Sequence, residues 1–302
     1  MIEDETAVEQ VNGRLRAARG ALSLAGARYW TASVMPALVG TTLPLWLRPP
    51  GFEFRWSGAS EFLVATVLAH SGFSFFHACF ARRGDGEWTP AGLSAAGSAC
   101  LVLAGLLGWH LIRFVPSLIF IAYGLSVLLA GALYVAPPAS FWRRPGGEIV
   151  LSMSLGLLPV LGAYLVQTGD LTRRVYLAAL PVYTAMLLWV WTEEMAFRQA
   201  EGDVQRNSLI AAFGRRVSGR VIVPGISALL CATVVAAVLS SSVMPLALLA
   251  LILVVPMWRV VALSRSAYND AAAMLRARNV AVVVHSGLCA VLTATSILAA
   301  AY

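Results

Sequence analysis

Nine apolar stretches, each about 20 residues long, limit how this chain can fold more than any other feature of its sequence. About 20 apolar residues are needed for a helix to cross the roughly 30 Å of hydrocarbon in a bilayer. We therefore predict nine transmembrane helices. They are centred at residues 30–47, 60–81, 91–112, 114–135, 149–167, 175–196, 221–241, 243–263 and 279–301.

The composition favours a membrane protein and leaves no room for a soluble domain. Hydrophobic residues make up 59% of the 302 residues and charged residues only 12%, and the mean hydropathy is +0.76. Soluble domains are far less apolar on average. The first 20 residues are polar and lack the apolar core of a secretory signal. We predict an all-α, polytopic bundle in which residues 1–27 form a cytoplasmic leader and residues 28–302 form a single transmembrane domain.

Arginines fix the expected orientation, because cytoplasmic loops carry an excess of positive charge. All 22 basic residues are arginines, of which 17 fall on the side of the N-terminus and five on the other side. The N-terminus should therefore be cytoplasmic and the C-terminus outside, in an inner or plasma membrane. The net charge of +7 requires no nucleic-acid partner, since arginines also suit anionic membrane lipids or an anionic substrate.

Two adjacent carboxylates, Glu193 and Glu194, end the sixth apolar stretch. An ionisable group at the rim of a membrane helix is costly unless a partner offsets it, so such a group indicates a functional site. Several arginines follow in the adjoining loop. If the helix continues, Glu193 and Glu201 lie on one face. The alternative interpretation is an ordinary solvated helix end.

A second polar face is expected at the inner end of the second apolar stretch. His70 and His77 are seven residues apart and therefore lie on nearly the same face of a helix, and Asp85 extends that face. Because both polar faces lie at cytoplasmic helix ends, we expect them to border one cavity between the second and sixth helices. Hydrogen bonding between helices is the alternative role for the two histidines.

Carboxylates, arginines, histidines and tyrosines at one end of an apolar bundle suit an amphiphile with a charged head and a hydrocarbon tail. Guanidinium groups bind phosphate oxygens bidentately, and carboxylates hold magnesium that bridges a diphosphate. The sequence contains no Walker loop, HExxH motif or GxSxG motif. ATP use, zinc proteolysis and serine hydrolysis therefore lack support.

Several segments, in one order along the chain, resemble the UbiA superfamily of intramembrane prenyltransferases. Within it they are most similar to the branch that prenylates dihydroxynaphthoate on the route to menaquinone. The segments are RYWTASVMPALVG, LYVAPPASFWRRPGGE with LGAYLVQTG, and RNSLIAAFG. The residues that match the family's motifs are Arg28, Thr31, Pro36, Gly40, Tyr134, Pro138, Gly147, Glu148, Gln167, Thr168, Gly169, Arg206, Ser208, Leu209 and Gly214. The resemblance implies a UbiA-like helical bundle.

The chain departs from the family at its two aspartate motifs. In place of NDxxDxxxD it has HACFARRGD, which keeps only Asp85 of the aspartates. In place of DxxxD it has FRQAE, where Phe197 replaces the first aspartate and Glu201 the second. In the family these motifs carry magnesium ions that neutralise the diphosphate of a prenyl donor. The resemblance therefore implies a depleted site that holds at most one well-coordinated Mg²⁺.

Together, the charged residues and the resemblance predict one site at the cytoplasmic end, whose partner is an isoprenoid lipid or prenyl diphosphate. The candidate catalytic residues are Glu193, Glu194 and His77. The candidate residues for binding the diphosphate are Arg82, Arg83, Arg143, Arg206, Asn207 and Tyr134. The candidate metal ligands are Asp85, Glu201 and Asp203.

Three functions agree with this site. The first is a diverged prenyltransferase that joins an isoprenoid from a diphosphate donor to an aromatic or lipid acceptor. The second is a metal-independent terpenoid cyclase in which Glu193 or Glu194 protonates an alkene or epoxide. The third is a non-catalytic subunit that binds an isoprenoid or quinone. Magnesium-dependent diphosphate release would favour the first function, and chelator-insensitive activity on a diphosphate-free substrate would favour the second.

Overall fold

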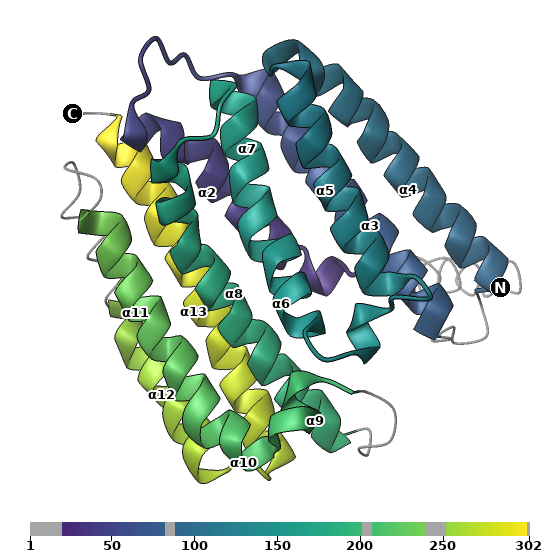
Figure 1. Ribbon diagram of the computed structural model, residues 1–302, viewed down its shortest axis with the longest axis vertical. Helices are drawn as coiled ribbons and strands as arrows, with labels where there is room; N and C mark the ends of the chain where they lie inside the picture. The colour runs from purple at the N-terminus through teal and green to yellow at the C-terminus, as the bar shows by residue number, and fades with distance from the viewer. Residues whose placement is uncertain (1–19, 82–87, 201–206, 240–249, 251, 301–302) are drawn as a thin grey trace, which may run out of the picture.

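The computed structural model describes residues 20–81, 88–200, 207–239, 250 and 252–300, and within these residues it contains helices and no strand (Figure 1). In chain order the elements are η1 (Ala27–Tyr29), α2 (Thr31–Leu47), α3 (Trp56–Ala81), α4 (Pro90–Leu111), η2 (Ile112–Phe114), α5 (Ser117–Val135), η3 (Phe141–Arg143), α6 (Gly147–Ser152), η4 (Met153–Leu157), α7 (Leu158–Thr168), α8 (Arg173–Ala200), α9 (Leu209–Phe213), α10 (Arg215–Val217), η5 (Ser218–Ile222), α11 (Val223–Leu239), α12 (Val254–Ser266) and α13 (Ala271–Ala299). The segments η4 and η5 are single π-helical turns.

Seven helical segments in the described part of the chain are long and apolar enough to cross a membrane. The prediction of an all-α, multi-pass membrane bundle is therefore confirmed, whereas nine full-length spans are not observed among the described residues. The first expected span is the 17-residue helix α2. The eighth corresponds to α12, which has 13 residues, and part of that expected span (243–249 and 251) lies outside the described residues. The fifth expected span is continuous through α6, η4 and α7.

The centre of the bundle is formed by α8, which packs along α13 and α11, while α2 packs along α7 and α13 (Figure 1). Small side chains on α8 allow the neighbouring helices to approach it closely: Ala179, Val182 and Ala185 are all fully buried. The main apolar cluster draws its side chains from α2, α7, α8, α11, α12 and α13. Since lipid tails are as apolar as these side chains, close packing of small residues is the main force available to hold such helices together.

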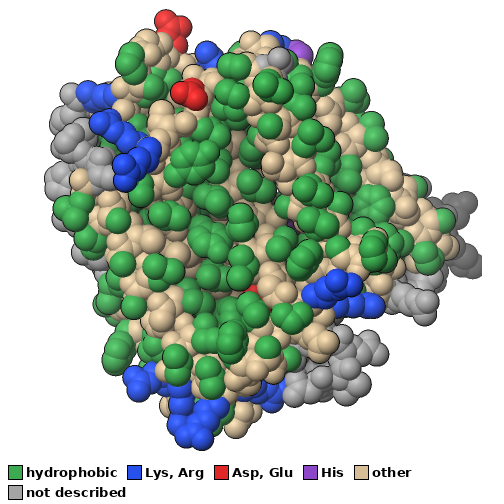
Figure 2. Space-filling model, viewed as in Figure 1, with side chains coloured by type: hydrophobic (Ala, Val, Ile, Leu, Met, Phe, Trp, Pro, Cys, Tyr) green, Lys and Arg blue, Asp and Glu red, His purple; other side chains and the backbone are tan. Residues whose placement is uncertain are grey.

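On the other side of the bundle, α3, α4 and α5 form a second layer (Figure 1). Helix α4 packs mainly along α3, where a side chain at Gly72 would collide with Leu101. Large apolar side chains on the outer surface of α4, such as Leu103 and Leu106, are exposed. Figure 2 shows an apolar surface over the middle of the molecule, with arginines gathered toward its ends, as expected for a protein surrounded by lipid.

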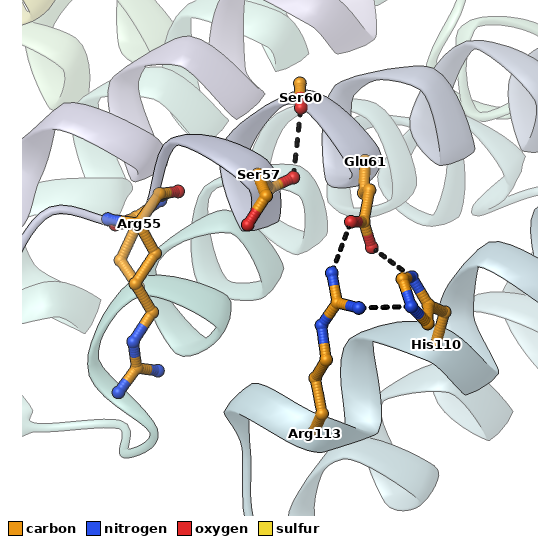
Figure 3. Close-up of polar contacts among 7 residues, drawn as sticks. Arg55, Ser57, Ser60, Glu61, His110 and Arg113 are labelled. Atoms are coloured by element: carbon orange, nitrogen blue, oxygen red, sulfur yellow. Dashed lines mark hydrogen bonds and ion pairs between the residues drawn. The ribbon is translucent and has the colours of Figure 1, made fainter.

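Polar contacts close the end of the bundle at which α3 begins and α4 ends. Glu61 on α3 accepts a hydrogen bond of 2.6 Å from Arg113 and contacts His110 Nδ1 at 2.8 Å (Figure 3). Arg55 donates to the carbonyl oxygen of Phe114 at 2.7 Å. Its backbone also exchanges two hydrogen bonds of 3.0 Å with the buried side chain of Gln167. These contacts join the loop before α3 to the ends of α4 and α7.

Candidate functional site

A chamber of about 960 Å³ lies between α2, α3, α4, α5, α7 and α8. Its lining runs along α3 from Phe62 to His77, which at 1.5 Å per residue corresponds to about 22 Å. Near Phe62 the walls are apolar. Near His77 the lining includes Tyr134, Glu148 and Glu194. We call this polar part, at the end of the bundle where α3 ends, the chamber head.

An aromatic cluster borders the chamber head on the side of α3 and α5. The imidazole ring of His77 stacks near the ring of Tyr134, with centroids 6.3 Å apart. It also meets the ring of Trp142 edge-on at 4.8 Å. The guanidinium group of Arg143 lies 4.2 Å from the Trp142 ring centroid. The head therefore combines flat aromatic surfaces with titratable groups.

Two glycines bring the loop after α5 back against the start of α6. Gly146 has φ +93°, a left-handed conformation that favours glycine. A side chain on Gly147 would collide with the backbone carbonyl of Phe141. This close approach helps to place Arg144 and Glu148 together in the chamber lining.

Glu148 is 5% exposed and links α6 to the segment that precedes α9. Its Oε1 atom accepts a hydrogen bond of 3.0 Å from the backbone N–H of Leu209. Nearby, the backbone N–H of Asn207 donates to the carbonyl oxygen of Arg143 at 3.0 Å. Within the described residues, the Oε2 atom of Glu148 has no hydrogen-bond partner. A buried carboxylate normally needs donors for both oxygens.

Glu193 has a different environment, because three side chains hold its carboxylate. Tyr29 donates to Oε1 at 2.9 Å, and the indole N–H of Trp189 donates to Oε2 at 3.2 Å. Arg278 on α13 forms an ion pair with Oε2 at 3.6 Å. The side chain of Glu193 is 16% exposed and that of Arg278 is 26% exposed. These contacts join the end of α8 to η1 and α13.

The second predicted histidine joins two helices. His70 Nδ1 on α3 lies 3.1 Å from the hydroxyl of Ser33 on α2, and both residues line the chamber. The indole N–H of Trp30 also donates to Ser71 at 3.2 Å. The interhelical hydrogen bond considered for the histidines is therefore present at His70.

Four residues of the predicted site lie together in the lining of one chamber: His77, Tyr134, Glu193 and Glu194. Arg143 and Asn207 are exposed and do not line it. The other predicted residues lie outside the described part of the chain. They are Arg82, Arg83, Asp85, Glu201, Asp203 and Arg206.

Four residues at or near the chamber had no role predicted from sequence: Glu148, Arg144, Tyr29 and Arg278. Glu148 has a recognisable signal, since it is a lone carboxylate at the start of an apolar span and matches the family's Gly-Glu motif. Arg144 follows the basic residue that was selected, Arg143. Tyr29 and Arg278 carry no comparable local signal, because each reaches Glu193 through the folding of distant helices.

Magnesium ligation cannot be assigned to the chamber head from its described residues. Among them, no three His, Cys, Asp or Glu side chains gather in a way that could hold a metal ion. The expected ligands Asp85, Glu201 and Asp203 are outside the described range. By itself, the described donor set does not fit a metal cluster.

The fold and the chamber define a class: a multi-pass α-helical membrane protein built around an intramembrane chamber with one polar end. Among solved structures, a UbiA homologue from Archaeoglobus fulgidus bound to Cd²⁺ matches with a TM-score of 0.70 and 14% identity, over 94% of this chain and 100% of that chain. A UbiA homologue from Aeropyrum pernix K1 matches with a TM-score of 0.62 and 17% identity, over 90% and 98% of the two chains.

A third solved structure, from a study of digeranylgeranylglyceryl phosphate synthase in membranes, matches with a TM-score of 0.63 and 11% identity, over 93% of this chain and 98% of that chain. No family model matches the sequence, and no curated protein is detectably similar to it. The chain therefore has the UbiA fold, as its sequence predicted.

Proposed function

We propose that this protein is a UbiA-type intramembrane prenyltransferase. It would join an isoprenoid from a diphosphate donor to an aromatic or lipid acceptor. The observation that carries the proposal is the chamber itself, which is apolar along most of about 22 Å and polar at one end. An isoprenoid chain of several units matches the apolar part, and a diphosphate with its acceptor matches the head.

The UbiA fold supports this proposal, because one of its structural neighbours comes from a study of digeranylgeranylglyceryl phosphate synthase. Resemblance to the dihydroxynaphthoate branch rests on sequence motifs, so an aromatic acceptor with hydroxyl groups is our first choice. Glu193 is held by Arg278, Tyr29 and Trp189, and this structural role favours transfer over a cyclase that would use Glu193 as its acid.

Arginine, together with a depleted magnesium site, is our proposed means of holding the diphosphate. Arg144 is the one guanidinium among the described residues that line the chamber, and it also donates to the carbonyl of Pro138 at 2.7 Å. Arg82, Arg83 and Arg206 are proposed to add charge to the same region. Guanidinium groups neutralise phosphate oxygens through short, charge-assisted hydrogen bonds.

Binding of geranylgeranyl diphosphate to the protein in nanodiscs tests this proposal. Arg144→Ala should weaken binding by about tenfold or more, since one charge-assisted hydrogen bond is worth about 1.5–3 kcal/mol. EDTA should weaken binding less than this substitution. Arg216→Ala is the control, because Arg216 is exposed on α10 and does not line the chamber.

Transfer itself is measured by incubating the same nanodiscs with 1,4-dihydroxy-2-naphthoate and following prenylated product and released diphosphate. Binding that EDTA abolishes and Arg144→Ala leaves intact would show a competent magnesium site instead of an arginine site. Absence of any diphosphate binding would end the prenyl-donor proposal. Recovery of an unmodified quinone or isoprenoid from the purified protein by mass spectrometry would then support a binding subunit.

A further inference from the structure

Three carboxylates line the chamber head, and they differ in burial and in their described hydrogen bonds and ion pairs. Glu193 accepts two hydrogen bonds and pairs with Arg278. Glu148 is more buried, accepts one backbone hydrogen bond through Oε1, and has no described partner at Oε2. An ionised carboxylate that is buried without a cation costs several kcal/mol, and such a group takes up a proton instead.

Among the groups around Glu148, Glu194 disfavours a negative charge on it, whereas the Ser208 hydroxyl and the backbone N–H groups of Glu148 and Leu209 favour one. Glu194 on α8 lines the same chamber and acts on Glu148 through like-charge repulsion. The titratable or charged groups at this end of the chamber, on the elements packed around α6, are Glu193, Glu194, Tyr134, His77, Arg143 and Arg144.

Neither arginine in this set is bonded to Glu148 in the described structure. Arg143 lies over the Trp142 ring and Arg144 donates to Pro138. The N–H of Leu209 satisfies only Oε1. Because Oε2 is enclosed in the described structure, the side chain must turn toward the chamber before a carboxylic acid at this position can donate a hydrogen bond to an anionic oxygen in the chamber head. A carboxylate would repel that oxygen. A buried acid kept neutral in order to donate in this way is an established device in enzymes.

We propose that Glu148 is a neutral carboxylic acid in the resting protein and acts as the general acid toward the anionic headgroup bound in the chamber head. The identity of that headgroup, a prenyl diphosphate, rests on the proposed function. As the bond between prenyl C1 and oxygen breaks, its electron pair goes to the diphosphate oxygen, which takes the proton of Glu148. The acceptor forms a bond to C1 and releases one proton, which returns to Glu148.

This step balances without a further reactant: prenyl diphosphate and acceptor give prenylated acceptor and protonated diphosphate, and the enzyme regains its proton. It assigns a proton-donating role to Glu148 and leaves Glu193 as a residue that positions the start of α2 against α8 and α13. Any magnesium that the chain binds would add to this charge neutralisation.

Infrared spectroscopy tests the protonation state without any need for turnover. The wild-type protein in nanodiscs at neutral pH should show the carbonyl band of a protonated carboxylic acid, with a shift in deuterated buffer. Glu148→Gln should remove this band, whereas Glu61→Gln should leave it, because Glu61 is an acid at the opposite end of α3 that is paired with Arg113. A wild-type spectrum without such a band, or a band that survives in Glu148→Gln, overturns the proposal.

Two further measurements test the donor role. Geranylgeranyl diphosphate should shift the Glu148 band, whereas geranylgeraniol, which has no diphosphate, should not. Glu148→Gln should lower the rate of prenyl transfer by roughly 10²–10⁴-fold, as is typical for loss of a general acid, while Glu61→Gln should retain the wild-type rate. A band that bound diphosphate leaves unshifted overturns the donor role.

If the protein does not use a prenyl diphosphate, the same measurements give a different combination of results. In that case the Glu148 band would still be present in the wild type and absent in Glu148→Gln, but geranylgeranyl diphosphate would not bind. That result would retain the neutral acid and reject diphosphate as its partner. Gln at position 148 keeps an oxygen that can accept from Leu209. A wild-type spectrum without the band overturns the proposal whether or not the variant folds.

Discussion

Glu193 illustrates at the scale of single residues how a carboxylate is tolerated beside a membrane. Its contacts come from η1, α8 and α13, so one side chain joins three elements. Removing one partner of a largely buried ion pair leaves the other charge without compensation. The strength of the junction should therefore depend on Arg278.

We expect Arg278→Ala to lower the free energy of unfolding by about 1–3 kcal/mol, because Glu193 loses its cation and keeps only two neutral donors. Chemical unfolding in detergent micelles measures this change. Arg276→Ala is a matched control two residues away: its side chain is 61% exposed and lies 4.0 Å from Asp270. Exposed pairs of this kind contribute about 0–1 kcal/mol.

A double variant separates pairing from general disruption of α13. Adding Glu193→Gln to Arg278→Ala removes the unpaired charge, so part of the lost stability should return. Equal losses for Arg278→Ala and Arg276→Ala would contradict the assigned role of the Glu193 ion pair.

Among single residues, the sequence predicted the site residues that can be recognised from their neighbours along the chain. Spacing along a helix placed His77 at an inner helix end, and the acid pair was visible as charge beside an apolar stretch. Tyr29 is 164 residues from Glu193, and their contact depends on how η1 meets α8. Helical periodicity carries no information about such pairs, so the partners of the predicted acids were not identified.

At the scale of helices, apolar length predicted most spans because the bilayer sets that length. The described helix through α6, η4 and α7 covers Gly147–Thr168, close to the expected residues 149–167. Its π-helical turn was not predicted. Such a turn depends on what packs beside it: a side chain at Gly156 would be in tight contact with Met186 and Tyr183 of α8.

Helices α4 and α5 border the chamber on the side that faces lipid. Gly105 and Gly108 on α4 and Gly124 on α5 line it, and a side chain at any of them would meet no neighbouring atom within 4 Å. We infer that the chamber opens to the bilayer between these helices, and that an isoprenoid tail enters there.

Gly105→Phe and Gly124→Phe should narrow this opening and slow the uptake of a dansyl-labelled farnesol from nanodiscs several-fold. The melting temperature should change little, since nothing is displaced at either position. Gly225→Phe is the matched control, because Gly225 on α11 also has no neighbour within 4 Å and does not line the chamber. Uptake slowed equally by all three variants, or by none, would place the opening elsewhere.

For the whole molecule, the arrangement of the helices follows from their apolar faces. The UbiA homologue from Archaeoglobus fulgidus has a similar arrangement, with a TM-score of 0.70, although only 14% of the residues are identical. The chamber could not be predicted in the same way. Its head combines residues from η1, α3, α5, α6 and α8, and its volume depends on how far these elements stand apart. The charge of the loops, by contrast, can be read directly from the sequence. It predicts which end of the bundle faces the cytoplasm.

Orientation remains a prediction that labelling can test. The exposed residues Glu53 and Arg216 belong to the loop before α3 and to α10, two segments at opposite ends of the bundle (Figure 1). In a variant whose four native cysteines are replaced, a membrane-impermeant thiol reagent added outside intact cells should label Glu53→Cys and not Arg216→Cys. Labelling of Arg216→Cys alone would reverse the orientation and place the chamber head outside.

The contact between Glu193 and Arg278 also constrains the order in which the protein can be completed during synthesis. The two residues are 278 − 193 = 85 positions apart, so at about 5–20 residues per second the ribosome reaches Arg278 roughly 4–17 seconds after Glu193. Throughout that interval the sixth span is present without the ion pair between Glu193 and Arg278. Helix α13 is thus the element whose synthesis completes this contact of the bundle.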